Sequence, residues 1–483
     1  MPPPFRPALA ALVAAALLAG CGTLSAPAQQ PARPALDLPA QWQQAQRDSA
    51  AVAAAADGAA AAADGAALVA DEARWWQRFG DPALDALVQE ALARNNDLAA
   101  ATIRVRRAQL QAGLAAEALA PDFGASLGAT SSRTFASGGA SATRRSASAS
   151  VSWETDLWGR LARTRDAAQW AAEASAQDRE ATALSLAATT ATLYWQLAYL
   201  NQRIALSEQS IAHARRTLQL VEAQRRAGAV SALELREASR SLATQEAAHT
   251  QLLQQRVETR HAFALLFDAP PQAARAEQPA LPDAALPAVD AGLPAGLLAR
   301  RPDLRAAELR LRSLLATEDA ARAAFYPRLT LTGSLGTSSS ALASAVSDPV
   351  GTLGAALALP LLQWRELRLN RQVAQADYDA AVAGFRQTLY QALAEVEDAL
   401  SAGTQYAAQG ERLQRALEDA REAERLYELR YRAGAEPLRA WLDAQQARRQ
   451  AEAALLQNRL ERLQNRVTLH QALGGDARAG QPG

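Results

Sequence analysis

Four histidines and one cysteine are the side chains of this sequence best suited to metal binding or nucleophilic chemistry. His213, His249, His261 and His470 all fall in segments with a helical pattern, and none has further candidate ligands at the spacing of a metal site. The sequence contains neither a glycine-rich phosphate loop nor a nucleophile elbow. We therefore expect solvated helix histidines, no bound metal, no cofactor and no enzymatic activity.

The single cysteine, Cys21, follows a segment that has the pattern of an export signal. Arg6 precedes an uncharged apolar stretch from Ala8 to Leu18, which is shorter than the roughly 20 residues of a membrane-spanning helix. Leu18-Ala19-Gly20-Cys21 resembles the lipobox of bacterial lipoproteins. That resemblance implies a signal peptide at residues 1–20 and acylation, palmitate included, of Cys21. The alternative is an ordinary secretory signal with an incidental cysteine.

Composition and charge exclude one class of partner. The 483 residues include 50 basic and 50 acidic side chains, so the formal net charge is zero and nothing favours binding to nucleic acid. Hydrophobic residues make up 49% of the chain but aromatic residues only 5%. This balance favours long packed helices over a thick globular core.

Matching residues recur along the chain at one constant separation. A shift of 206 positions relates Asp97 to Asp303, Arg104 to Arg310, Pro121 to Pro327, Trp158 to Trp364, and Arg226-Ala227-Gly228-Ala229 to Arg432-Ala433-Gly434-Ala435. A gapless register over so long a stretch indicates an internal duplication. We expect a lipidated linker at 21–74, a first repeat at 75–278, a second at 279–474 and a tail at 475–483. The Ala- and Pro-rich lead, 22–74, and the Pro-rich joint, 270–294, have the composition of unpacked linkers.

Each copy shows the same order of hydrophobic patterns. Asp81 and Pro82 open a helical segment that we expect to run to about Ala120. Two strands of alternating pattern follow, then a very long helix and a returning helix. The expected strands are 123–129 and 147–153 in the first copy and 329–335 and 353–359 in the second; the expected first-copy helices are 156–225 and 231–267, and the second returning helix is 437–473.

The strands have the length of membrane-crossing strands, about 9 to 11 residues. Four strands cannot close on themselves, and open edges leave backbone groups unpaired in lipid, so several chains must combine. Two alternatives remain at this point. The hairpins could belong to a soluble sheet, and the helices could form a solid coiled-coil rod, as in a periplasmic tether; a tether, however, does not need the paired hairpins.

Several motifs together resemble the TolC-like outer-membrane efflux proteins, most closely their lipoprotein branch, the NodT class, which serves RND-type pumps. The resemblance covers roughly residues 75 to 474. The motifs are Trp75-Trp76, Val151-Ser152-Trp153-Glu154-Thr155-Asp156-Leu157-Trp158-Gly159-Arg160, the segment from Arg226 to Leu235, Tyr431-Arg432-Ala433-Gly434 and Trp441-Leu442-Asp443-Ala444-Gln445.

The resemblance implies a mainly α protein with membrane β structure. It implies a homotrimer whose twelve-stranded outer-membrane β-barrel, four strands per chain, continues as a long periplasmic α-helical barrel. Such a lipid-anchored duct exports drugs and other small molecules received through a periplasmic adaptor protein from an inner-membrane RND-type transporter. The nearest alternative with the same fold is the outer duct of a type I protein-secretion system.

Two sets of residues are candidates for function within this frame. Gly228 and Gly434 stand where the long helices must reverse, and glycine supplies the left-handed conformation of such an end. By resemblance, the tips dock the adaptor, and they comprise Arg226, Gly228, Ala229, Arg432, Gly434 and Ala435.

The second set is the pair formed by Asp443 and Arg439. By resemblance, Asp443 occupies the position of the acidic ring at the narrow periplasmic end. Arg439 stands where relatives often have an apolar plug, so this chain departs from that pattern. An ordinary exposed pair one helical turn apart is the alternative.

Overall fold

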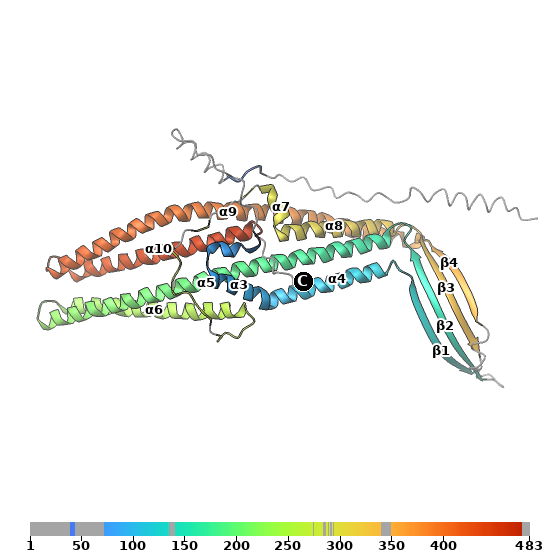
Figure 1. The fold of residues 1–483 in the computed structure, drawn as a ribbon, viewed down its shortest axis with the longest axis horizontal. Helices are drawn as coiled ribbons and strands as arrows, with labels where there is room; N and C mark the ends of the chain where they lie inside the picture. The colour runs from blue at the N-terminus through green and yellow to red at the C-terminus, as the bar shows by residue number, and fades with distance from the viewer. Residues whose placement is uncertain are drawn as a thin grey trace, which may run out of the picture. The chain divides into compact units, whose positions relative to one another are not determined.

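The computed structural model describes residues 39–43, 72–133, 135, 141–273, 275–283, 286–287, 289, 292, 294–339 and 349–475. Cys21, the signal peptide and most of the linker therefore lie outside the described residues. The elements, drawn in Figure 1, are η2 (Glu72–Phe79), α3 (Pro82–Arg94), α4 (Asn96–Glu117), β1 (Asp122–Arg133), β2 (Ser141–Thr155), α5 (Arg160–Arg226), α6 (Ala232–Leu265), η3 (Pro294–Gly296), α7 (Leu297–Arg300), α8 (Pro302–Ala323), β3 (Arg328–Ser339), β4 (Val350–Ala358), η5 (Leu361–Gln363), α9 (Trp364–Arg432) and α10 (Leu438–Ala472).

The chain divides into two compact units, each built from both copies. The sheet unit contains the four strands and comprises, within the described part of the chain, Arg104–Ala176 and Ala306–Arg386. The helical unit comprises Asp37–Ile103, Gln177–Arg305 and Gln387–Gly483. The long helices α5 and α9 contribute to both units. No helix among the described residues is long and apolar enough to span a membrane.

The duplication read from the sequence is confirmed by the elements themselves. β1 and β3 occupy equivalent positions in the two copies, α5 and α9 end at the equivalent Arg226 and Arg432, and α6 and α10 begin at the equivalent Ala232 and Leu438. The predicted strands and long helices are present, and the returning helices begin within one residue of the predicted starts. The two copies therefore share one local architecture.

The helical segment expected from Pro82 to about Ala120 is present as two helices, α3 and α4, which are separated by a break at Asn95. The backbone of Asn95 is extended, with ψ of 130°. Its side-chain oxygen accepts hydrogen bonds from the backbone N–H groups of Asp97 (3.0 Å) and Leu98 (3.1 Å). Asn95 thus caps α4 and satisfies donors that a helix start would otherwise leave free.

The second copy breaks at the equivalent residue, Arg301, with ψ of 119°. Here Pro302 fixes the start of α8. The buried Arg301 guanidinium forms ion pairs with Asp303 (2.8 Å) and Glu395 (2.7 Å). Burial alone would raise the pKa of the Asp303 carboxyl, but hydrogen bonds from Arg301 outweigh it, so the pKa is lower than usual.

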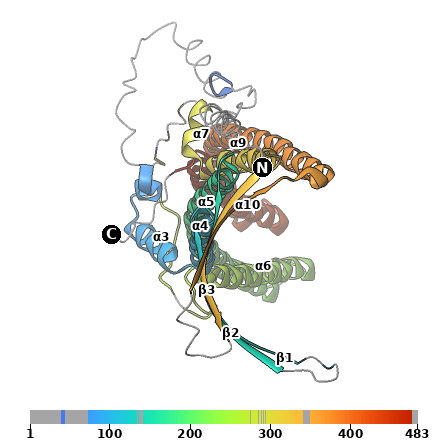
Figure 2. The same ribbon diagram turned by 90° about the vertical axis from the view of Figure 1, so that its right-hand side faces the viewer.

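A buried aromatic core holds the helical unit together. Trp75 and Trp76 of η2 are almost fully buried, with ring centroids 5.8 Å apart at 84°. They belong to one cluster with Trp195 of α5, Phe267 and Leu463 of α10. In both ribbon views α3 lies beside α5 (Figures 1 and 2). Each fully buried large side chain contributes about 1.5–3 kcal/mol, so this core fixes where the helices meet.

The two segments expected to be unpacked linkers are packed where the structure describes them. In the joint, Leu281 is buried in the aromatic core. Arg275 pairs with Glu90 at 2.7 Å and lies 3.6 Å above the ring of Phe267. In the lead, Trp42 is buried and its indole N–H donates to the carbonyl of residue 292 at 2.8 Å. The prediction from composition is wrong for these segments because a few large side chains among prolines and alanines are enough to pack a segment against the helices.

Candidate functional site

The four strands form one antiparallel sheet in the order β1-β2-β3-β4. The register pairs Phe123 with Val151, Val151 with Gly333, and Gly333 with Leu353. Side chains directly opposite one another share a face, so the apolar positions of all four strands lie on the same side. That face carries Phe123, Leu127, Val151, Trp153, Leu329, Leu331, Leu335, Leu353 and Leu357.

The opposite face of the sheet is polar. Ser126 lies opposite Ser148, Ser152 opposite Thr332, and Ser334 opposite Thr352. The hydroxyls of Ser126 and Ser148 are 2.8 Å apart and hydrogen-bonded. A sheet with one apolar and one polar face can separate lipid from water. Its outer strands, β1 and β4, have no further partner strand among the described residues, so both edges are open to another chain.

Both helix reversals have the geometry that the sequence predicts. Gly228 and Gly434 adopt left-handed φ values of 76° and 75°. The N–H of Ala229 donates to the carbonyl of Gln224 at 2.9 Å, and that of Ala435 to the carbonyl of Arg430 at 2.8 Å. These are Schellman helix ends. A Cβ added at either glycine would meet no described atom within 4 Å, so the space beside each glycine is open to a partner.

The structure also brings together the predicted gate residues. Arg439 Nε lies 3.9 Å from Asp443 Oδ2, one helical turn apart on α10. Their side chains are 78% and 74% exposed. A pair so exposed contributes only a few tenths of a kcal/mol within one chain.

A buried contact between the two helical hairpins lies close to this pair and was not foreseen. Trp441 of α10 is 2% exposed and packs with Val221 of α5, Ala238 of α6 and Tyr431 of α9. The rings of Trp441 and Tyr431 stack at 5.3 Å, and the Tyr431 hydroxyl donates to Gln224 Oε1 at 2.6 Å. We call these residues the hairpin clasp. Trp441 and Tyr431 both belong to motifs that carry the family resemblance, but a sequence motif does not show which residues will be in contact.

The expectation of solvated histidines is wrong for His470, which is 5% exposed. Its imidazole stacks on Trp75 with ring centroids 5.2 Å apart. Burial, together with the nearby positive charges of Arg78 and Arg466, lowers the pKa of His470 to about 4. His213 is half-buried, 3.1 Å from Gln445, and burial lowers its pKa as well. Both histidines lie within the packing of the helical unit.

Comparison with known proteins places this architecture in a family. The family model described as "Outer membrane efflux protein" matches residues 87–267 and 293–475, one segment in each copy. The pyoverdine export outer membrane protein OpmQ of Pseudomonas putida is 35% identical over 419 residues, covering 85% of this chain and 89% of that protein. Toxin and drug export protein A of Aggregatibacter actinomycetemcomitans is 30% identical over 402 residues, covering 83% and 88%.

A solved structure agrees with these matches. The open state of the MtrE outer membrane channel of Neisseria gonorrhoeae superposes with a TM-score of 0.76 at 28% identity, covering 93% of this chain and 98% of that chain. The duplicated helical architecture, the two-faced sheet and these relatives lead to one assignment. The chain belongs to the outer membrane efflux protein family, and its fold is that of the trimeric TolC-like channels that span the outer membrane, extend into the periplasm and serve efflux pumps.

Proposed function

We propose that this chain is the exit duct of a tripartite system that exports small molecules. An inner-membrane transporter of RND type supplies the energy, and a periplasmic adaptor joins it to the duct. The observation that carries the proposal is the pair of equivalent, unobstructed Schellman tips at Gly228 and Gly434, which offer the same docking geometry twice per chain. The relation to OpmQ, a pyoverdine exporter by name, supports a small-molecule cargo.

An export assay tests this function directly. The chain is expressed with its cognate adaptor and transporter in a strain that lacks outer-membrane efflux ducts. We expect lower accumulation of a fluorescent dye and release of small cargo to the medium. Unchanged accumulation, with the channel present in the outer membrane, would contradict the proposal.

A second candidate is the outer duct of a type I protein-secretion system. One observation favours it, because a relative is named as an exporter of toxin as well as drug. The same strain, supplied with a protein-secretion transporter and its substrate protein, separates the two functions. Secreted protein without dye efflux would favour the second candidate.

Bulky substitutions at the tips are expected to abolish efflux while leaving the trimer intact. A non-glycine residue in the left-handed region costs about 1–2 kcal/mol, but the Cβ that Gly228→Gln or Gly434→Gln adds has no described atom of the chain within 4 Å. It projects instead toward the docking partner. Dye efflux and trimer content of the membrane are the two measurements.

Gly80→Gln is the matched control, because Gly80 also has a left-handed φ, 66°, and open space around it. It lies between η2 and α3, remote in sequence from both tips. We expect near-normal efflux from this control. Equal loss of efflux in all three variants would show that backbone strain is responsible, and normal efflux in both tip variants would refute docking there.

We further propose that signal cleavage after residue 20 leaves an acylated Cys21 at the start of the linker, 21–74, which tethers the repeats 75–278 and 279–474 to the membrane. Mass spectrometry of the mature N-terminus should find a mass increase from acyl chains, absent in Cys21→Ser. A processed chain with an unmodified Cys21 would disprove the anchor.

A further inference from the structure

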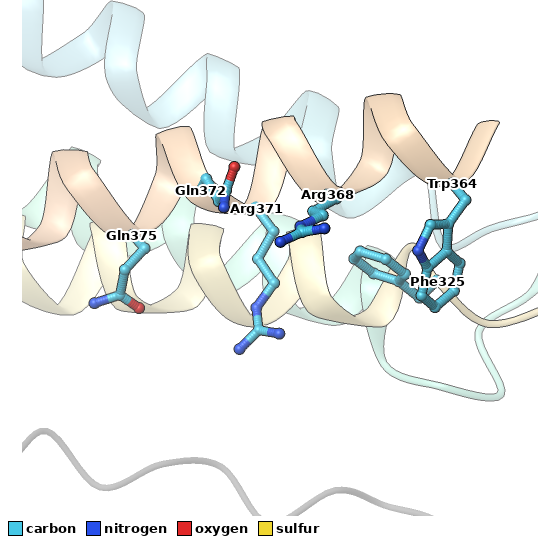
Figure 3. Close-up of a pocket in the computed structure, with 6 residues that line it drawn as sticks. All are labelled: Phe325, Trp364, Arg368, Arg371, Gln372 and Gln375. Carbon is cyan, nitrogen blue, oxygen red and sulfur yellow. The ribbon is translucent and has the colours of Figure 1, made fainter.

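A pocket of about 410 Å³ in the sheet unit combines aromatic rings with positive charge. Figure 3 shows two rings side by side at one end and Gln375 at the other, with two guanidinium groups between them. No carboxylate lines it. The lining residues are Phe325, Trp364, Arg368, Arg371, Gln372 and Gln375.

The aromatic end of this pocket adjoins the ends of two strands. Phe325 stands three residues before β3 begins, and Trp364 six residues after β4 ends. Their ring centroids are 5.0 Å apart at 81°, and Trp364 is 59% exposed. These strand ends connect to helices, and the helices of the family extend into the periplasm. The pocket therefore lies at the periplasmic boundary of the outer membrane, a depth at which exposed tryptophans favour lipid headgroups.

The two arginines are arranged to receive an anion. Arg371 Nε donates a long hydrogen bond of 3.4 Å to the buried carboxylate of Glu318, which also receives a bond from Arg322. This contact is also an ion pair, so Arg371 and Arg322 share the single negative charge of Glu318. Arg368 has no ion-pair partner among the residues that the structure describes. Paired guanidinium forks match the geometry of a phosphate group.

The first copy has an acidic residue at a position where the second copy has a neutral one. At the position equivalent to Gln372 it has Asp166, which pairs with Arg165 at 2.6 Å and Arg163 at 3.4 Å. Arg165 is the equivalent of Arg371. In the second copy the nearby acid is Glu318, whose one charge is shared by Arg371 and Arg322, so a surplus of positive charge remains for a ligand.

The tryptophans of the two copies differ in the same way. The indole N–H of Trp158 donates to the carbonyl of Pro327 at 2.7 Å, and its ring stacks on Tyr326 at 4.8 Å. Its equivalent, Trp364, has no hydrogen-bond partner among the described residues. An indole N–H at a membrane boundary is suited to a headgroup acceptor.

The pocket also lies off the face that a neighbouring chain needs. With 3.6 residues per turn, Leu369 and Val373 point roughly 100° to 160° away from Arg368 and Arg371 around α9. These apolar side chains are 52% and 59% exposed, which suits a seam between chains of the trimer. The acidic Glu366 and Asp377 lie on the same side of α9 as Val373, roughly 20° and 40° from it around the helix. The pocket face is therefore free to meet lipid.

We propose that this pocket binds the phosphate of a phospholipid in the periplasmic leaflet, with the guanidinium groups of Arg368 and Arg371 on the phosphate and the rings of Phe325 and Trp364 against the glycerol and first acyl carbons. This goes beyond export, because it is a lipid site on the outer surface of the duct. One site per chain gives three per trimer.

Native mass spectrometry of the purified trimer with added phosphatidylglycerol tests the site. We expect one tightly retained phospholipid per chain in the wild type. Arg368→Gln with Arg371→Gln should weaken retention about tenfold or more, since charge-assisted hydrogen bonds are lost. Gln372→Asp should weaken it as well, because it restores the acid that the first copy has.

Arg163→Gln with Arg165→Gln is the matched control, since it removes the same charge from the equivalent helix of the first copy. Retention should be unchanged in this control, and all variants must remain trimeric. Equal loss in the control would overturn the site, because it would reflect net charge alone.

Two further probes identify the ligand. Diacylglycerol with the same acyl chains should not be retained, and millimolar inorganic phosphate should not displace the phospholipid. Equal retention of diacylglycerol would mean that the pocket is a nonspecific apolar surface. Displacement of the phospholipid by inorganic phosphate would mean that the pocket binds free anions. Either result would overturn the lipid assignment.

Discussion

Trp441→Ala is expected to raise the resting conductance of the trimer in planar bilayers and to lower its thermal stability. Trp441 fills the hairpin clasp between α5, α6, α9 and α10, and truncation of a buried tryptophan costs about 3–5 kcal/mol. A shift from 1% to 99% of one state requires about 5.5 kcal/mol. We expect the clasp to join the two hairpins mainly in the closed duct, so losing three clasps in one trimer should move the duct strongly toward open.

Two matched variants separate the clasp from general packing. Trp195 is 1% exposed and belongs to the aromatic core, so Trp195→Ala should destabilise the protein by a similar amount without raising conductance. Trp441→Leu introduces the residue that the first copy has at the equivalent position, Leu235, and should give an intermediate conductance. If Trp441→Ala lowers thermal stability but leaves conductance at the wild-type value, the clasp stabilises the fold and does not keep the duct closed.

The position of the clasp explains why the pair of Arg439 and Asp443 is exposed. Leu438 and Trp441 place one face of α10 in the buried cluster. Arg439 and Asp443 stand on the other face, where both side chains are exposed. The clasp thus fixes the orientation of the Arg439 and Asp443 side chains, although the pair itself contributes little stabilisation within one chain.

The sheet was predictable because its signal is local. Alternation of apolar and polar residues gives each strand a lipid face without reference to its partner, and the register then aligns Phe123, Val151 and Leu353 on one side. The reversals at Gly228 and Gly434 were predictable for the same reason, since a left-handed helix end selects glycine.

Features that depend on distant contacts were not predictable. Asn95 breaks a helical segment that has no proline near the break, and only its side-chain cap in three dimensions shows why. His470 has the same helical surroundings in sequence as an exposed histidine, but Trp75, almost 400 positions earlier, covers it. The lipid pocket also required the structure, because Phe325 and Arg368 meet only when α8 and α9 lie side by side.

Asp443→Ala is expected to change the conductance most at low salt, where charges at a threefold aperture interact over the longest range. We propose that Arg439 and Asp443 line the narrow periplasmic end and hold it nearly closed. Removal of the carboxylate leaves three unbalanced Arg439 cations, which repel one another and widen the opening. Conductance divided by the conductivity of the bulk solution is the measurement.

Salt and a second substitution distinguish charge from size. The Debye length falls from about 10 Å at 0.1 M to about 3 Å at 1 M salt, so the gain in Asp443→Ala should shrink at high salt. Adding Arg439→Ala removes the repelling cations and should reverse much of the gain, a non-additive result that marks coupled residues. The 3.9 Å separation and high exposure of the pair within one chain mean that any such coupling must come from the assembled trimer.

The first copy supplies the control for this experiment. Glu237 stands 206 positions before Asp443, on α6, where the residue equivalent to Arg439 is Leu233. Glu237→Ala removes the same charge without leaving an equivalent cation one turn earlier, so we expect wild-type conductance at every salt concentration. Equal effects of Glu237→Ala and Asp443→Ala would point to the overall potential of the duct. An unchanged conductance of Asp443→Ala at low salt would leave Asp443 as an exposed helix residue and place the constriction at the hairpin clasp, where Trp441→Ala already tests it.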